Sequence, residues 1–117
     1  MNTDRNTTKV SIGGRLTVCP NDVIMLQANI NYSMVYLADG KQLLVATTLK
    51  KLEERFSDFA FVRMNKTYMI NTDYIIEVNE NSLKLSNSLT ITFSRRKGKK
   101  WKEYMADKTS IIQKNVS

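Results

Sequence analysis

Apolar and polar residues alternate with a period of two along most of this chain, a pattern typical of half-buried β-strands. Residues 10–18 predict a hairpin that turns at Gly13-Gly14, and Asp39-Gly40 predicts a second tight turn. Further strands are expected over 23–28, 32–37, 42–46, 61–63, 68–70, 74–78, 83–85 and 89–93. The pattern therefore predicts a mostly β fold of about nine or ten short strands in small packed sheets.

One segment has the period of a helix instead. Leu49, Leu52 and Phe56 recur at i, i+3 and i+7, and a threonine before them can cap the helix. We predict one short helix over about residues 48–56, with its apolar stripe packed on the sheet. Apolar residues from Trp101 onward also fit helical spacing, which predicts a second helix near the C-terminus.

The composition fits one globular domain. The chain has 117 residues, of which 42% are hydrophobic and 25% charged, enough for one core and too few for two. The longest apolar run, residues 23–26, is far shorter than the roughly 18 residues of a membrane span, and the N-terminus has no signal region. We expect a cytoplasmic protein with a polar extension (1–8), one domain (9–103) and a tail (104–117) that could be helical.

Catalytic chemistry finds little support in the residue types present. The chain contains no histidine, which excludes Ser-His and Cys-His nucleophilic pairs and histidine-based metal sites. The single cysteine, Cys19, is expected to be a small packing residue, and Gly13-Gly14 does not match a phosphate-binding glycine loop. We therefore predict no enzymatic activity, no cofactor, no metal site and no small-molecule substrate.

Positive charge is concentrated near the C-terminus. Residues 1–94 carry ten Lys or Arg against nine Asp or Glu, whereas residues 95–117 carry eight against two. Six of these eight fall within 95–102. Charge at that density attracts phosphates, and neutralising them releases counterions. A solvated tail is the alternative, but the cluster directly follows a strand pattern, which favours a nucleic-acid surface.

The order and spacing of several segments carry a family resemblance. Residues 61–71 read Phe-x-Arg-x-Asn-Lys-Thr-Tyr-x-x-Asn, and 94–96 read Ser-Arg-Arg after a strand. Upstream stand a strand and polar break (22–33), a second strand and turn (36–41) and the helix (48–53). In all of these the chain resembles the LytTR family of DNA-binding domains over roughly residues 9–103. It departs from the family at Asn65, where a histidine is common.

The resemblance implies an elongated, mostly β bacterial transcription regulator whose inter-strand loops enter successive major grooves of double-stranded DNA. The positions that match the family's contact regions are Asn29, Asn31, Ser33, Asn65, Lys66, Thr67, Arg95, Arg96, Lys97, Lys99 and Lys100. Arginine pairs bidentately with guanine, so Arg95 or Arg96 is the candidate for base readout. The lysines after them are candidates for phosphate contacts.

Each of these residues also has a structural interpretation. Lys66 could read guanine or hold a phosphate, and Asn31 and Ser33 could bond an adenine edge or a phosphate oxygen. Arg63 is expected to be structural, as a partner for Asp73 or Glu77. Asn71 is expected to hold a turn through its own backbone.

The resemblance also suggests partners. Family members commonly bind direct repeats, so we expect two copies, a homodimer on DNA, on one face of the duplex. Many members carry a receiver domain that this sequence lacks, so a small membrane protein could be the restraining partner. The alternative functions are an interaction protein that modulates a related DNA-binding regulator and a non-specific nucleic-acid binder.

Overall fold

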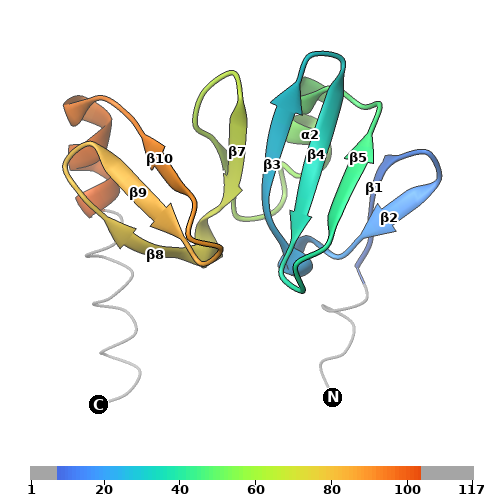
Figure 1. Ribbon diagram of the computed structural model, residues 1–117, viewed down its shortest axis with the longest axis horizontal. Coiled ribbons are helices and arrows are strands. Elements are labelled where there is room, and N and C mark those ends of the chain that lie inside the picture. Colours follow the sequence, from blue (N-terminus) through green and yellow to red (C-terminus); the bar gives the residue numbers. More distant parts are fainter. Residues whose placement is uncertain (1–7, 104–117) are drawn as a thin grey trace. The chain divides into compact units, whose positions relative to one another are not determined.

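The computed structural model describes residues 8–103. The chain divides into two compact units, Met1–Tyr74 and Ile75–Ser117, and both are built mainly from antiparallel strands (Figure 1). Ten short strands are present within residues 8–103, which confirms the predicted mostly β fold. The predicted extension 1–8, apart from its last residue, and the predicted tail 104–117 lie outside the described residues.

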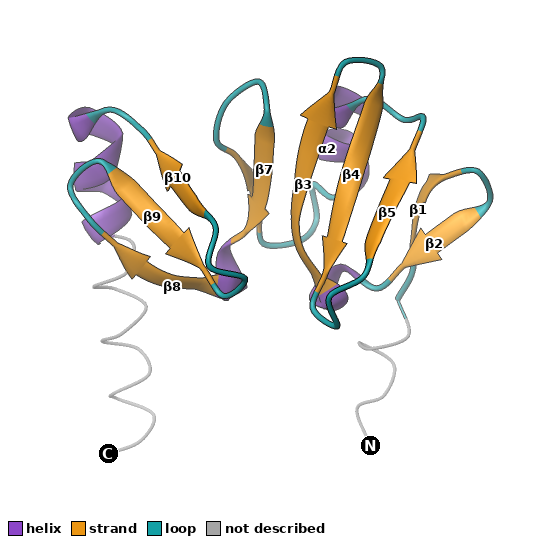
Figure 2. Ribbon diagram, in the orientation of Figure 1, coloured by secondary structure: helices purple, strands orange, loops and turns teal. Residues whose placement is uncertain are grey.

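A five-stranded antiparallel sheet is the centre of the first unit (Figure 2). Its strands lie in the order β5-β4-β3-β7-β6, so the long hairpin of β3 and β4 occupies the middle. A separate two-stranded sheet pairs β1 with β2. The bounds are β1 Val10–Gly13, β2 Leu16–Val18, β3 Val23–Asn29, β4 Tyr32–Leu37, β5 Gln42–Val45, β6 Phe61–Arg63 and β7 Tyr68–Asn71. Short 3-10 turns, η1 (Pro20–Asp22) and η2 (Thr72–Tyr74), precede β3 and follow β7.

Helix α2 (Leu49–Arg55) covers one face of this sheet and confirms the predicted helix to within a residue at each end. Thr48 caps it, since the hydroxyl oxygen accepts a hydrogen bond from the Lys51 amide at 3.3 Å. Leu52 and Phe56 are fully buried in the core, and the Phe56 ring packs edge-on against that of Phe61 with centroids 4.7 Å apart. Burial of side chains of this size is worth roughly 1.5–3 kcal/mol each.

The first hairpin turns one residue later than the sequence predicted. Gly14 and Arg15, with φ of 59° and 65°, form the turn, and Gly13 belongs to β1. A Cβ on Gly13 would overlap the hydroxyl oxygen of Thr47. Gly13 therefore serves a close approach between β1 and the segment before α2, and Gly14 supplies the left-handed turn.

The second unit is a three-stranded sheet with a helix after it. Its strands, β8 (Ile75–Val78), β9 (Ser82–Leu85) and β10 (Thr90–Thr92), lie in the order β10-β9-β8, and Leu83 and Leu85 are fully buried. The chain is helical from residue 95 to residue 103, the last that the structure describes. None of the helices within residues 8–103 is both long and apolar enough to cross a membrane.

This helix begins earlier than the sequence predicted, at residue 95, directly after Ser94. Gly98 is buried, and a Cβ there would overlap the backbone carbonyl of Glu80. Ser94 caps the helix, accepting from the Lys97 amide at 3.4 Å through its hydroxyl and from the Gly98 amide at 3.0 Å through its carbonyl. Glycine is a poor helix former, but here it allows two backbones to touch.

Candidate nucleic-acid interface

The tip of the β3–β4 hairpin carries the first group of candidate residues. Asn29 and Tyr32 are paired across a two-residue turn made of Ile30 and Asn31. The side chains of Asn29 and Asn31 are both exposed. Each amide offers a donor and an acceptor to a base edge or a phosphate.

Ser33 differs from its neighbours in this group. Its side chain is fully buried, and its hydroxyl donates a hydrogen bond to the carbonyl oxygen of Thr47 at 2.6 Å. The bond joins β4 to the segment that enters α2. A side chain with no accessible surface cannot contact DNA in this conformation, so we assign Ser33 to the fold and leave it out of the interface proposed below.

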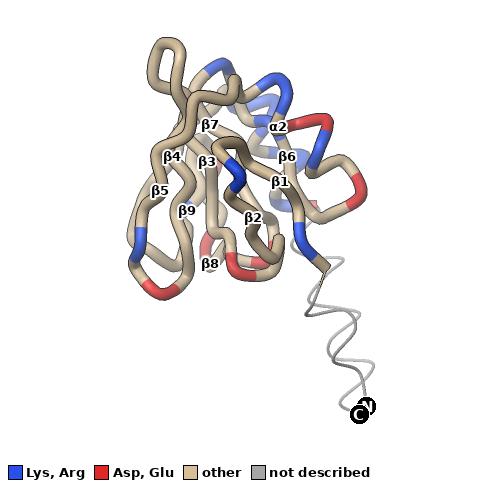
Figure 3. Tube along the Cα trace, turned by 90° about the vertical axis from the view of Figure 1, so that its right-hand side faces the viewer, with Lys and Arg blue, Asp and Glu red and all other residues tan. Residues whose placement is uncertain are grey.

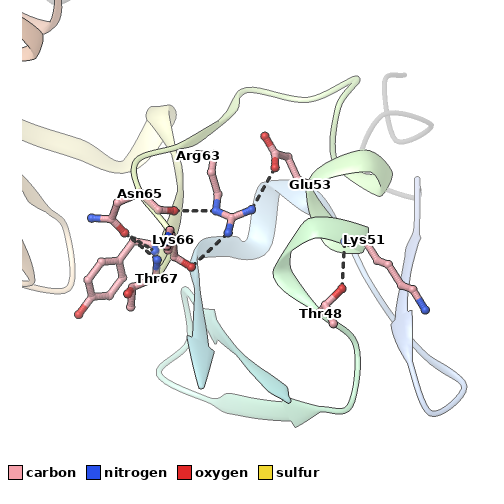
Figure 4. Close-up of polar contacts among 8 residues, drawn as sticks. Thr48, Lys51, Glu53, Arg63, Asn65, Lys66 and Thr67 are labelled. Carbon is pink, nitrogen blue, oxygen red and sulfur yellow. Dashed lines mark hydrogen bonds and ion pairs between the residues drawn. The ribbon is translucent and has the colours of Figure 1, made fainter. Parts of the chain in front are cut away.

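The loop between β6 and β7 carries the second group, Asn65, Lys66 and Thr67, and all three are exposed. The Asn65 side-chain oxygen accepts hydrogen bonds from the amides of Thr67 and Tyr68, both at 2.8 Å (Figure 4). This arrangement is an Asx turn, in which the side chain stands in for a backbone carbonyl. Asn65 therefore shapes the loop that presents Lys66.

Arg63 holds the same loop in place through hydrogen bonds to its backbone. Its guanidinium donates to the backbone carbonyls of Asn65 at 2.7 Å and Lys66 at 3.1 Å, and to the Glu53 carboxylate at 3.0 Å (Figure 4). The expected structural role is thus confirmed, but the expected partners, Asp73 or Glu77, were wrong. The acidic partner is on α2, so Arg63 ties the loop to the helix.

The two loops lie at the same end of the five-stranded sheet (Figure 1). β3 and β7 are antiparallel neighbours, and the Ala28 amide donates to the Thr67 carbonyl at 2.7 Å. This bond holds the second loop beside the last residues of β3, next to the hairpin tip. The sheet therefore presents exposed polar residues from two loops along one edge of the first unit.

The third group lies on the helix that follows β10, not in an extended loop. Figure 3 colours all Lys and Arg of the described residues blue. Arg95, Lys99 and Lys102 are spaced as one helix face and, with Glu80, line a groove of about 300 Å³. Arg96 lies two residues from the buried Gly98, roughly 200° around the axis. It therefore points away from the packed side of the helix, and it is exposed.

Other chemistry is sparse among residues 8–103. They contain no group of three or more His, Cys, Asp or Glu placed to hold a metal ion. Burial, followed by the negative charges of Asp22 and Asp73, raises the pKa of Tyr74 above its ordinary value. The Tyr74 hydroxyl donates to the Asn21 carbonyl, so this tyrosine supports the fold at η1.

Sequence reasoning missed two residues near these loops. Glu53 gave no signal as a loop partner, because it lies ten positions from Arg63 on a different element. Ile30 could have been noticed in the sequence, because it is an apolar residue between two asparagines in a predicted polar break.

Comparisons with known proteins agree on one family. The family model for the LytTr DNA-binding domain matches residues 13–106, well over half of the chain. The search of curated proteins found no match to this chain. Among solved structures, the fold is similar to a LytTr DNA-binding domain from Bacillus cereus, part of a protein described as a methyl-accepting/DNA response regulator. The similarity has a TM-score of 0.62 at 13% identity and covers 84% of this chain and 94% of that one. This chain belongs to the LytTR family of DNA-binding domains.

Proposed function

We propose that this protein is a bacterial transcription regulator that binds double-stranded DNA at specific sequences. The hairpin tip, the β6–β7 loop and the basic helix would each contact a groove or the adjoining backbone. The family assignment supports DNA as the ligand. Binding to the chromosome would place the protein in the cytoplasm.

The observation that carries this proposal is the crowding of cations at the start of the last helix. Arg95, Arg96 and Lys97 occupy its first turn. The N-terminal end of a helix carries partial positive charge, which disfavours cations, and neighbouring like charges repel one another. The helix end therefore does not favour cations at these positions. A phosphate beside that turn would be attracted by the cations and by the helix end together.

The geometry suggests a division of roles. Arg96, exposed and opposite the packed side, is our choice for bidentate recognition of guanine. Arg95, Lys97, Lys99 and Lys100 would hold phosphates and set the register of the protein on the duplex. On the first unit, Asn29, Asn31, Asn65, Lys66 and Thr67 would contact base edges or phosphates through the two adjacent loops.

We further propose that two copies bind direct repeats. One copy would occupy each half-site, with half-sites spaced by whole helical turns of roughly 34–36 Å so that both lie on one face of the duplex. Sedimentation of the protein with duplexes carrying one or two half-sites tests this. A complex of one protein per two-site duplex at saturation would refute it.

A selection from random duplex DNA at about 150 mM salt, followed by sequencing, tests the main proposal. We expect a recurring motif. Arg96→Ala should then lose about 1–3 kcal/mol of discrimination at one base pair, whereas Lys100→Ala should weaken all sequences alike and reduce the salt slope. No enriched motif, together with binding that falls uniformly with salt, would instead identify a non-specific nucleic-acid binder.

Control by a small membrane protein stays a prediction, and so does the alternative of an interaction protein. Co-expression with a candidate membrane protein and a reporter of promoter activity tests the first. For the second, a variant with Lys66, Arg95 and Arg96 all changed to alanine would keep its regulatory effect only if DNA contact is dispensable.

A further inference from the structure

Ile30 is the most exposed large apolar side chain within residues 8–103. Its accessible fraction is 92%, against at most 57% for the others. It stands at the tip of the β3–β4 hairpin, with the exposed amides of Asn29 and Asn31 on either side. An isolated isoleucine at a loop tip contributes nothing to the core.

Its backbone conformation is also unfavourable for its residue type. Ile30 has φ of 55°, in the left-handed region that favours glycine, asparagine and aspartate. A β-branched side chain is among the least suited to that region. Neither the turn nor the core therefore accounts for isoleucine here, and a strained, exposed residue of this kind points to a binding role.

We infer that Ile30 reads a thymine by packing on its C5 methyl group in the major groove. This inference rests on the proposed function and deepens it, because it adds an apolar base contact to a set of polar ones. The thymine methyl is the apolar group that base pairs expose in the major groove, and aliphatic side chains recognise it by contact.

The shape and surroundings of the tip suit that target. The major groove is about 12 Å wide and admits a two-stranded β-ribbon, so a two-residue turn can lead the hairpin into it. Ile30 is flanked by amides that can bond to neighbouring base edges or phosphates. A single aliphatic group among polar ones matches a methyl on a polar groove floor better than it matches a broad apolar protein surface.

The experiment uses a duplex that carries the selected site, with each thymine replaced in turn by deoxyuridine, which differs only in lacking the methyl group. We expect wild-type affinity to fall about fourfold at one position, the effect of losing one buried methyl. Ile30→Ala should bind the thymine duplex several-fold more weakly than wild type and should not distinguish thymine from uracil there. Leu44→Ala, which shortens an aliphatic side chain that is 54% exposed on β5 of the same sheet, should keep the wild-type preference.

A second variant separates binding from folding. Ile30→Asn places a residue that tolerates positive φ at the turn, so its melting temperature should equal or exceed that of wild type. Its affinity for the thymine duplex should nonetheless fall to that of Ile30→Ala.

The outcomes that overturn the inference are distinct. A selected site whose affinity is unchanged by every uracil, or whose methyl preference survives in Ile30→Ala, overturns this inference and leaves the proposed function standing. Absence of any selected site for the wild-type protein overturns both.

Discussion

Replacing Arg63 by methionine removes the guanidinium but keeps most of the aliphatic stem, so it isolates the polar contacts under the β6–β7 loop. The guanidinium donates to two loop carbonyls, at 2.7 and 3.1 Å, and to Glu53 at 3.0 Å. Hydrogen bonds from a charged donor are worth roughly 1.5–3 kcal/mol each, and the low end applies because the Arg63 side chain is 25% exposed.

The ion pair with Glu53 should matter less than the carbonyl bonds. The Glu53 side chain is 49% exposed, and solvent-exposed pairs contribute about 0.2–1 kcal/mol. We therefore expect Arg63→Met to lower the free energy of unfolding by about 2–4 kcal/mol, and Glu53→Gln by about 1 kcal/mol or less. Arg63→Lys should resemble Arg63→Met, because one ammonium cannot reproduce a planar fork that serves three acceptors.

Two measurements test this without DNA. Urea unfolding gives the change in stability, and hydrogen exchange reports the amides of Thr67 and Tyr68, which the Asn65 side chain protects. Exchange at these amides should accelerate about tenfold or more in Arg63→Met and little in Glu53→Gln. If Glu53→Gln were as damaging as Arg63→Met, the charge pair and not the carbonyl bonds would hold the loop, and the reasoning would be refuted.

Three further changes probe the fold around the interface. Asn71→Ala removes a buried amide that donates to the Pro20 and Val23 carbonyls, and should cost about 2–4 kcal/mol in urea unfolding; a loss below 1 kcal/mol would contradict the buried bonds. Gly98→Ala forces a methyl onto the Glu80 carbonyl and should cost about 1–3 kcal/mol, whereas the exposed Lys100→Ala should be near neutral; equal melting temperatures would argue against the close contact. Since its folded pKa is raised above 10.0, Tyr74 ionises first in the unfolded chain. Stability should therefore fall as pH rises through 10 toward the folded pKa, a decline that Tyr74→Phe should lessen; identical pH profiles would contradict it.

Local patterns predicted the elements of this fold well, because each depends on neighbours in the sequence. The stripe of α2 and its threonine cap are local, and both are confirmed. The burial of Ser33 could also have been predicted, since Ser33 and the buried Val35 are two residues apart on one strand and share a face.

Contacts between distant segments could not be predicted in this way. The pairing of Arg63 with Glu53 depends on how α2 packs on the sheet, and the close approach of Gly98 to Glu80 depends on how the last helix packs. The candidate DNA contacts of both units came from the motif and the charge run. The exposed orientation of Arg96 could not be predicted from local periodicity, because it depends on which side of the helix packs against the rest of the unit.

The five-stranded sheet ends in short strands on both sides. Its central strand, β3, has seven residues, whereas the outer strands β5 and β6 have four and three. A short outer strand offers few unpaired backbone groups to a second chain, so this sheet is poorly suited to growth by edge-to-edge pairing. In the proposed arrangement of two copies on adjacent half-sites, bending and twisting of the duplex between them would couple their binding, so we expect the length and sequence of that spacer to affect the cooperativity.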